Sequence, residues 1–189
     1  RELLDKDPSL VHARSAAKHR ATLLHYVAAN GVESERQLTP PNAVEVAKVL
    51  LDAGAKVDAL AETYGGGPGQ TTLNLLVSSV HPFRAGVQAD LVEVLLDAGA
   101  AINGLPDDGS PVRVALMFGY VGAARTLERR GCRIGDFDVA AGLGNVAAME
   151  RMLAENNHAP GPEFMEEAFT NACGNGQIAA AKLLLDRGF

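Results

Sequence analysis

Cysteine is scarce in this sequence, with Cys132 and Cys173 the two among 189 residues. Two cysteines are too few for the disulfide framework of a small secreted protein, although a single bridge between them stays open. Long apolar runs are missing as well, because no stretch approaches the roughly 18 residues that span a membrane. The opening residues, RELLDKDPSL, do not resemble a signal peptide. We therefore expect a folded protein of the cytoplasm with no membrane partner.

Positive charge is also in the minority. The chain carries 17 lysines and arginines against 23 aspartates and glutamates, which gives a formal net charge of -6. A protein that binds duplex nucleic acid needs a basic stripe to neutralise phosphates, and an acidic overall field opposes such binding. We therefore expect no nucleic-acid partner.

Two local groups of basic residues stand out against this background. Arg125, Arg129, Arg130 and Arg133 lie at the end of an expected helix, where cations compensate the helix dipole. The second group, HARSAAKHR at residues 12–20, falls in an expected turn and is open to an acidic partner.

Patterns that carry catalysis or metal binding are missing. The five histidines show no His-x3-His spacing and the cysteines no Cys-x2-Cys spacing, so no zinc site is expected. These histidines are His12, His19, His25, His81 and His158. A Cys173–His158 pair stays open, but no nucleophile, base and orienting group can be placed together from the sequence. We expect no enzyme, no catalytic residue, no metal and no cofactor.

The glycine-rich segment GGGPGQTT, from Gly65 to Thr72, invites comparison with a phosphate-binding loop. It lacks the Gly-Lys-Ser/Thr ending of that motif, and no expected strand leads into it. We interpret the segment as a flexible turn.

What the sequence does contain is an internal repeat. The phrase VLLDAGAKVDA at 49–59 returns as VLLDAGAAIN at 94–103. Fainter copies are LLDKDP near the start, TLERRGCRI at 126–134, RMLA at 151–154 and LLLDRGF at 183–189. Their apolar spacing predicts the end of a helix. In four copies a glycine follows, at the place where a left-handed residue closes a helix. These glycines are Gly54, Gly99, Gly131 and Gly188.

A second kind of expected helix, rich in small residues, alternates with these endings. Its copies are TLLHYVAANG at 22–31, TTLNLLVSS at 71–79, SPVRVALMFG at 110–119, VAAGLGN at 139–145 and AFTNACGNG at 168–176. Small side chains let such a helix pack closely between its neighbours. In the last copy we expect Cys173 to serve as a small packed residue. Turns such as PDDGSP at 106–111 join one pair of helices to the next.

These residues carry a family resemblance. TLLH (Thr22 to His25) and SPVR (Ser110 to Arg113) resemble the T-P-L-H-x-A phrase of ankyrin repeats, and LLDAGA resembles the ending of their second helix. The resemblance implies an all-α ankyrin-repeat solenoid of stacked helix-turn-helix units, with a concave side and projecting turns. It also implies a structural role for His25, whose imidazole would bridge backbone groups of its own turn and the neighbouring one.

The repeat boundaries that follow span residues 1–189 as a single array. They are 1–14 for the end of a partial repeat, 15–59 and 60–103 for repeats with insertions, 104–134 for a repeat, 135–157 for a short repeat and 158–189 for a truncated one. Both ends cut through a repeat, which we interpret as a fragment of a longer array or as a surface for self-association.

Departures from the family spacing of about 33 residues predict local irregularity. Gly54 and Gly99 are 45 residues apart, so extra residues are expected as loops between the helices, at 32–42 and 80–90. In the first of these, Pro40 and Pro41 would restart the second helix. After Gly131 the next inner helix follows early, which predicts a shortened turn around Gly135.

Candidate binding residues lie near the third full unit. Met117, Phe118 and Tyr120 fall at expected surface positions on the concave side, and aromatic and methionine side chains are frequent in binding hot spots. Asp107 and Asp108 would stand on the adjoining turn. Packing of Phe118 against the neighbouring unit is the alternative.

The sequence therefore predicts a scaffold that binds a partner protein through its concave face and turns. Fold alone does not fix function. Two alternatives stay open. The chain is a regulatory or targeting segment of a larger enzyme or effector, or a module that assembles with copies of itself.

Overall fold

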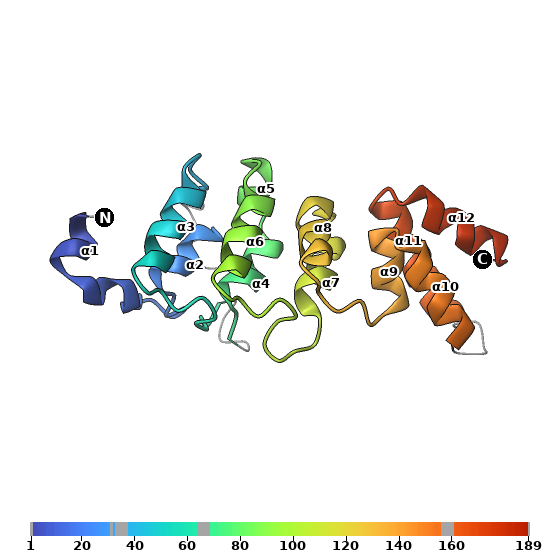
Figure 1. Ribbon diagram of the computed structural model, residues 1–189, viewed down its shortest axis with the longest axis horizontal. Coiled ribbons are helices and arrows are strands. Elements are labelled where there is room, and N and C mark those ends of the chain that lie inside the picture. The colour runs from blue at the N-terminus through green and yellow to red at the C-terminus, as the bar shows by residue number, and fades with distance from the viewer. Residues whose placement is uncertain (1, 31, 33–37, 64–68, 156–160, 189) are drawn as a thin grey trace. The chain divides into compact units, whose positions relative to one another are not determined.

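The structure is a computed structural model that describes residues 2–30, 32, 38–63, 69–155 and 161–188 (Figure 1). Within these residues the regular structure is helical, and extended pairing is limited to two isolated bridges, Arg14 with Thr22 and Ala61 with Gln70. The all-α expectation is confirmed for this part of the chain. The contacts divide it into two compact units, residues 1–111 and 112–189, and each is described by itself.

The first unit contains two pairs of packed helices. Its elements are α1 (Glu2–Lys6), the 3-10 helix η1 (Pro8–His12), α2 (Leu23–Val27), α3 (Ala43–Asp52), α4 (Thr72–Val77), α5 (Val80–Arg84) and α6 (Gln88–Asp97). Helix α2 packs on α3, and α4 packs on α6. The pairs also contact each other like with like, α2 with α4 and α3 with α6. The unit is therefore two layers of helices, and each pair covers the apolar side of the next.

The second unit repeats this arrangement. Its elements are α7 (Ser110–Met117, which begins just before the division), α8 (Val121–Arg129), α9 (Phe137–Leu143), α10 (Val146–Glu155), α11 (Pro162–Gly174) and α12 (Ile178–Asp186). Helix α9 packs on α10 and α11 packs on α12, while α9 also contacts α11 and α10 contacts α12.

Glycines close the second helix of several pairs, as the repeated phrase predicts. Gly54, Gly99, Gly131 and Gly188 have φ values of 94°, 86°, 87° and 93°. After α3, the N–H of Gly54 donates to the Leu51 carbonyl at 2.9 Å and the N–H of Ala55 donates to that of Leu50 at 3.0 Å. A left-handed residue at this point lets two carbonyls of the last turn find donors.

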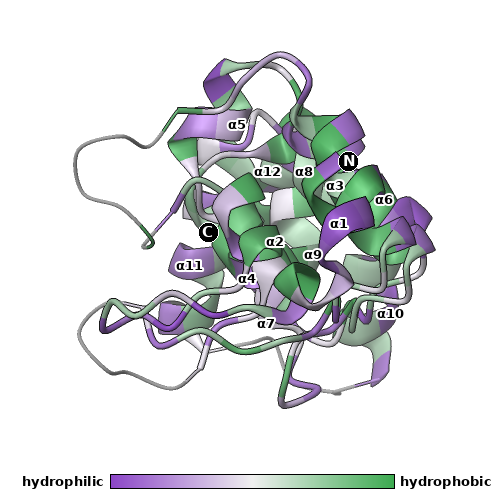
Figure 2. Cartoon of the chain, turned by 90° about the vertical axis from the view of Figure 1, so that its left-hand side faces the viewer, coloured by the Kyte–Doolittle hydropathy of each residue, from purple (hydrophilic) through white to green (hydrophobic). Residues whose placement is uncertain are grey.

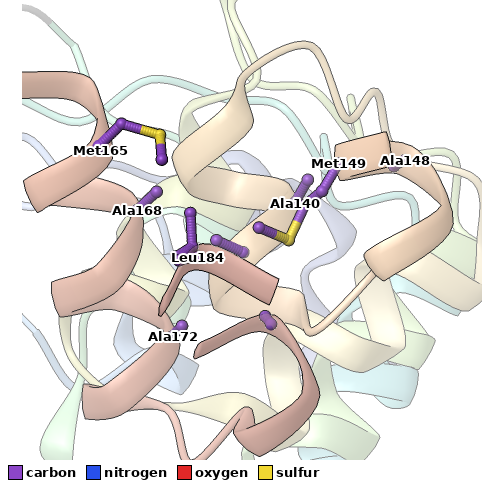
Figure 3. Close-up of a cluster of buried hydrophobic side chains, with 9 residues drawn as sticks. Ala140, Ala148, Met149, Met165, Ala168, Ala172 and Leu184 are labelled. Carbon is purple, nitrogen blue, oxygen red and sulfur yellow. The ribbon is translucent and has the colours of Figure 1, made fainter. Parts of the chain in front are cut away.

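Small residues bring the helices of the second unit close together. Figure 3 shows the side chains of Met149, Met165 and Leu184 filling the space beside three alanines, Ala140, Ala168 and Ala172. A Cβ atom added to Gly142 of α9 would lie 3.0 Å from Leu116 Cδ1. The prediction that small residues permit close approach is confirmed here.

The expected loop at 80–90 is wrong in part, because Val80–Arg84 forms helix α5 and α6 already begins at Gln88. Pro82 is buried in the first turn of α5, where its missing N–H leaves no helical hydrogen bond unmade. Residues 33–37 of the other insertion lie outside the described residues, as do residues 65–68 of the glycine-rich segment. Pro40 and Pro41 immediately precede Asn42, the N-cap of α3.

Other expectations concern a turn and the cysteines. The connection from α8 to α9 covers residues 130–136, shorter than the connection 98–109 between α6 and α7, so the shortened turn near Gly135 is confirmed.

Both cysteines are free; Cys132 is buried and Cys173 is exposed. The prediction that Cys173 packs inside was wrong, because neighbouring Ala172 takes the buried position of α11.

The inner helix at the end of the chain is also longer than expected. It begins at Pro162 rather than near Ala168. In the part of the chain that the structure describes, no helix has the length and apolar content to cross a membrane.

Candidate functional site

His25 occupies the centre of the turn network in the first unit. The side chain has no exposed surface, and its Nδ1 accepts a hydrogen bond from the Thr22 N–H at 3.1 Å. On the other side of the ring, Nε2 lies 3.0 Å from the Ala59 carbonyl oxygen and 3.2 Å from that of Gln70. Carbonyl oxygens only accept, so Nε2 carries the proton of a neutral imidazole. The expectation that His25 bridges its own turn and the neighbouring one is confirmed.

Burial lowers the pKa of His25 below its ordinary value of 6.5, because desolvation disfavours the imidazolium. The two carbonyl hydrogen bonds act in the opposite direction but are the smaller effect. A second proton on Nδ1 would also face the Thr22 N–H, which needs that nitrogen as an acceptor. The environment of His25 therefore favours the neutral ring on both counts, and its role is structural.

Arg113 stands at the corresponding position of the SPVR phrase in the second unit. Its guanidinium forms ion pairs with Asp136, at the N-cap of α9, and with Asp138 inside that helix at 3.2 Å. The Asp138 side chain is 11% exposed and also accepts a hydrogen bond from Asn171 Nδ2 of α11 at 3.3 Å. This polar network joins α7, α9 and α11. The sequence analysis missed it, although Arg113 in place of the phrase's histidine was a visible signal.

The candidate aspartates belong to the first unit. Asp107 and Asp108 are both exposed in the connection between α6 and α7. Asp108 Oδ1 accepts a hydrogen bond from the Ser110 N–H at 2.9 Å, so this carboxylate helps to shape the start of α7. Nearby, the N–H of Gly109 donates to the Asn103 carbonyl at 2.9 Å and closes the turn.

The candidate apolar residues belong to the second unit, at the end of α7. Met117 is 67% exposed and Phe118 is 49% exposed, as the sequence predicts for surface positions. Tyr120 is 7% exposed, so the prediction that it lies on the surface was wrong. Its ring stacks on that of Phe118 with centroids 5.9 Å apart. Tyr120 therefore supports one face of the half-exposed Phe118 ring.

The basic group at the end of α8 is exposed, and its contacts reach its own helix and the N-cap of α12. Arg125 lies 3.7 Å from Glu128 in an ion pair one turn along α8, and also donates to Gln177 Oε1 at 3.1 Å. Arg129 donates to Thr126 Oγ1 at 3.0 Å. These contacts agree with solvated side chains that finish a helix.

No protein-family model matches the chain, and no curated protein matches its sequence. The case for Met117 and Phe118 as binding residues therefore depends on their exposure and geometry alone.

An apolar groove in the first unit is a surface that the sequence analysis did not find. The groove has a volume of about 520 Å³ and lies between α1, η1, α2 and α3. Among its lining residues, Leu3 is 71% exposed, Leu23 is 41% exposed and Val46 is 40% exposed. In Figure 2, hydrophobic green covers much of α2 and α3 at this end of the unit. Helical periodicity alone could not identify this groove, because it does not show which apolar faces have a neighbour.

Groups that resemble a metal site are absent from the described ranges, since no three His, Cys, Asp or Glu side chains converge there. Among the described residues, burial also raises the pKa of Cys132, to about 11. A thiol with a raised pKa is a poor nucleophile at neutral pH.

Proposed function

We propose that the chain is an ankyrin-type repeat array that binds a partner protein and catalyses no reaction. Support for the repeat class comes from the recurring helix pairs, which pack like with like inside each unit, and from the glycines that close their second helices. The His25 link between successive turns adds to this support. Repeats of this kind bury apolar faces against each other and leave a long surface of variable side chains for recognition.

The observation that carries the binding function is the exposed pair Met117 and Phe118. Large apolar side chains held in water by a rigid support are typical of binding hot spots, because their burial by a partner releases water at little entropic cost. Phe118 has such a support in the stacked ring of Tyr120. Met117 adds an unbranched side chain that adapts to the shape of a partner.

The experiment uses the intact chain as bait to purify partner proteins from a native lysate. The dissociation constant of each captured protein is then measured with purified components. The double variant Met117→Ala/Phe118→Ala is expected to weaken binding by about tenfold or more, which corresponds to at least about 1.4 kcal/mol.

The matched control is Ile178→Ala/Leu185→Ala, which removes two other exposed apolar side chains of the same unit, 70% and 53% exposed. The control is expected to leave the dissociation constant unchanged, and both variants are expected to keep the urea unfolding midpoint of the parent. Equal affinity of the parent and the Met117/Phe118 variant would remove this surface from the proposal.

Assembly with a second copy of the chain is the second candidate function. The apolar groove between α1 and α3 favours it, because exposed leucine and valine side chains are stabilised by burial in a protein interface. Light scattering across protein concentrations tests this candidate. A mass that rises with concentration in the parent and stays constant in Leu3→Ser/Val46→Ser would support it, whereas a constant monomer mass for the parent would exclude it.

A further inference from the structure

A second pocket of the first unit is lined by basic side chains. It holds about 290 Å³ between the end of η1, the start of α2 and the turn that follows α3. Three of its six lining residues carry or can carry positive charge, His12, Arg14 and Lys56, and all three are exposed. The other three, Val11, Thr22 and Ala59, carry no charge. In a chain with a net charge of -6, a pocket with this lining is a local exception.

Arg14 is held in place by the backbone. Its Nη1 donates to the Arg20 carbonyl at 2.9 Å and to the Leu60 carbonyl at 2.7 Å. A guanidinium has five N–H groups, so these two bonds leave those on Nε and Nη2 for another acceptor. Because the side chain is already ordered, binding through it loses less conformational entropy than binding through a mobile arginine.

No acidic residue of the described part of the chain lines the pocket, and two that lie close in sequence to its cations, Asp58 and Asp7, accept hydrogen bonds elsewhere. Both carboxylate oxygens of Asp58 accept the Ala101 N–H, at 3.2 and 3.0 Å. Asp7 accepts from the N–H and hydroxyl of Ser9. The backbone N–H of Glu62 donates to the His19 carbonyl at 2.7 Å, but the Glu62 side chain does not line the pocket.

From this arrangement we infer that the pocket binds a single anionic group, a carboxylate or a phosphate, on a peptide segment of the partner protein. This inference rests on the proposed function and adds a chemical requirement to it. One pocket of this size accommodates one such group, whereas a nucleic acid would need a row of cations along its backbone. A phosphate monoester carries nearly two negative charges and binds more tightly than a carboxylate.

The test titrates the full ¹⁵N-labelled chain with three blocked tripeptides, Gly-phosphoserine-Gly, Gly-Glu-Gly and Gly-Ser-Gly. Saturable shifts are expected at the backbone amides of residues 11–14 and 56–59 with the phosphopeptide. The glutamate peptide is expected to bind several-fold more weakly, and the serine peptide not at all. Equal binding of the two acidic peptides would support the requirement for an anionic group and overturn the preference for phosphate. Absence of saturable shifts with both would overturn the inference.

Variants distinguish phosphopeptide binding at the pocket from a general effect of surface charge on binding. Lys56→Gln is expected to weaken phosphopeptide binding by about threefold or more, because it removes one cation beside the anion. Lys48→Gln, which removes an exposed lysine of α3 outside the pocket, is expected to change it little. Arg14→Gln also breaks two backbone contacts, so Lys56→Gln is the decisive variant. Equal effects of Lys48→Gln and Lys56→Gln would overturn the inference.

The same variants distinguish failure here from failure of the proposed function. If a captured partner binds Lys56→Gln as tightly as the parent and the phosphopeptide does not compete, the anion pocket is wrong and the binding function stands. If the phosphopeptide binds at the pocket while no protein partner is captured, the pocket stands and the proposed function is wrong.

Discussion

The two units link successive turns at the same position of a repeated phrase but with different chemistry. In the first unit, His25 is fully buried and neutral, and it reaches the carbonyls of Ala59 and Gln70. In the second, Arg113 has a side chain that is 43% exposed and pairs with two carboxylates, Asp136 and Asp138. One link is therefore made of hydrogen bonds away from water, and the other of charges close to it.

This difference determines how each link responds to change. When one partner of a buried hydrogen bond is removed, the group that remains is left without a partner and without water. Breaking the His25 link therefore lowers the free energy of unfolding strongly. An ion pair near the surface is screened by water and ions, so the Arg113 link contributes less. We expect acid to lower the contribution of the His25 link to the free energy of unfolding, and salt to lower that of the Arg113 link.

The largest expected effect is that of His25→Ala. The change leaves the Thr22 N–H and two carbonyls without their partner and opens a cavity in the turn, so we expect the free energy of unfolding to fall by about 2 to 4 kcal/mol. Urea unfolding measures the loss. Hydrogen exchange at the amides of Ala61 and Gln70, which bond each other across the bridge, is expected to accelerate. The exposed His12→Ala is the control, and an equal loss there would contradict the assignment.

Acid is the next test of the comparison. Because the pKa of His25 lies below 6.5 in the folded protein, the unfolded chain takes up the proton first as the pH falls. Its contribution to stability is complete above about pH 6.5 and is lost below that pH, with a slope of at most about 1.4 kcal/mol per pH unit. Urea unfolding at pH 8, 6.5 and 5.5 measures the loss. The part due to His25 is expected to be absent from His25→Gln and retained in His12→Gln.

The smallest expected effect is that of Arg113→Met. We expect a loss of about 1 kcal/mol or less at low salt, because the Arg113 side chain is nearly half exposed. The loss is expected to shrink in 1 M NaCl, where charges are screened over about 3 Å. The control is Arg151→Met, whose pair with Glu155 at 4.0 Å is more exposed and is expected to contribute nothing measurable. A loss for Arg113→Met as large as that for His25→Ala would show that burial does not govern the two links.

Much of the helical framework was predictable from residue spacing. Gly54 and Gly99 follow the same apolar phrase, and both have the positive φ that ends a helix. His25 was predictable by resemblance, because an imidazole can accept on one side and donate on the other. The helix at 80–84 was not, since five residues around Pro82 carry too little periodicity to indicate a helix.

The candidate surface was predictable only in part. Met117 and Phe118 are exposed as expected, but Tyr120 is buried beneath the Phe118 ring. A tyrosine after a glycine has no periodic signature that tells a support from a contact residue. The groove beside Leu3 and the pocket around Arg14 were also beyond the sequence, because their walls come from segments far apart in the chain.

The order of helices, turns and glycine closures was determined by the sequence itself, because each depends on residues within a few positions of one another. Tertiary structure alone decided which apolar side chains are covered and which cations meet around one pocket. Burial and charge clustering depend on neighbours that the backbone brings together, and spacing along the chain does not encode that distance.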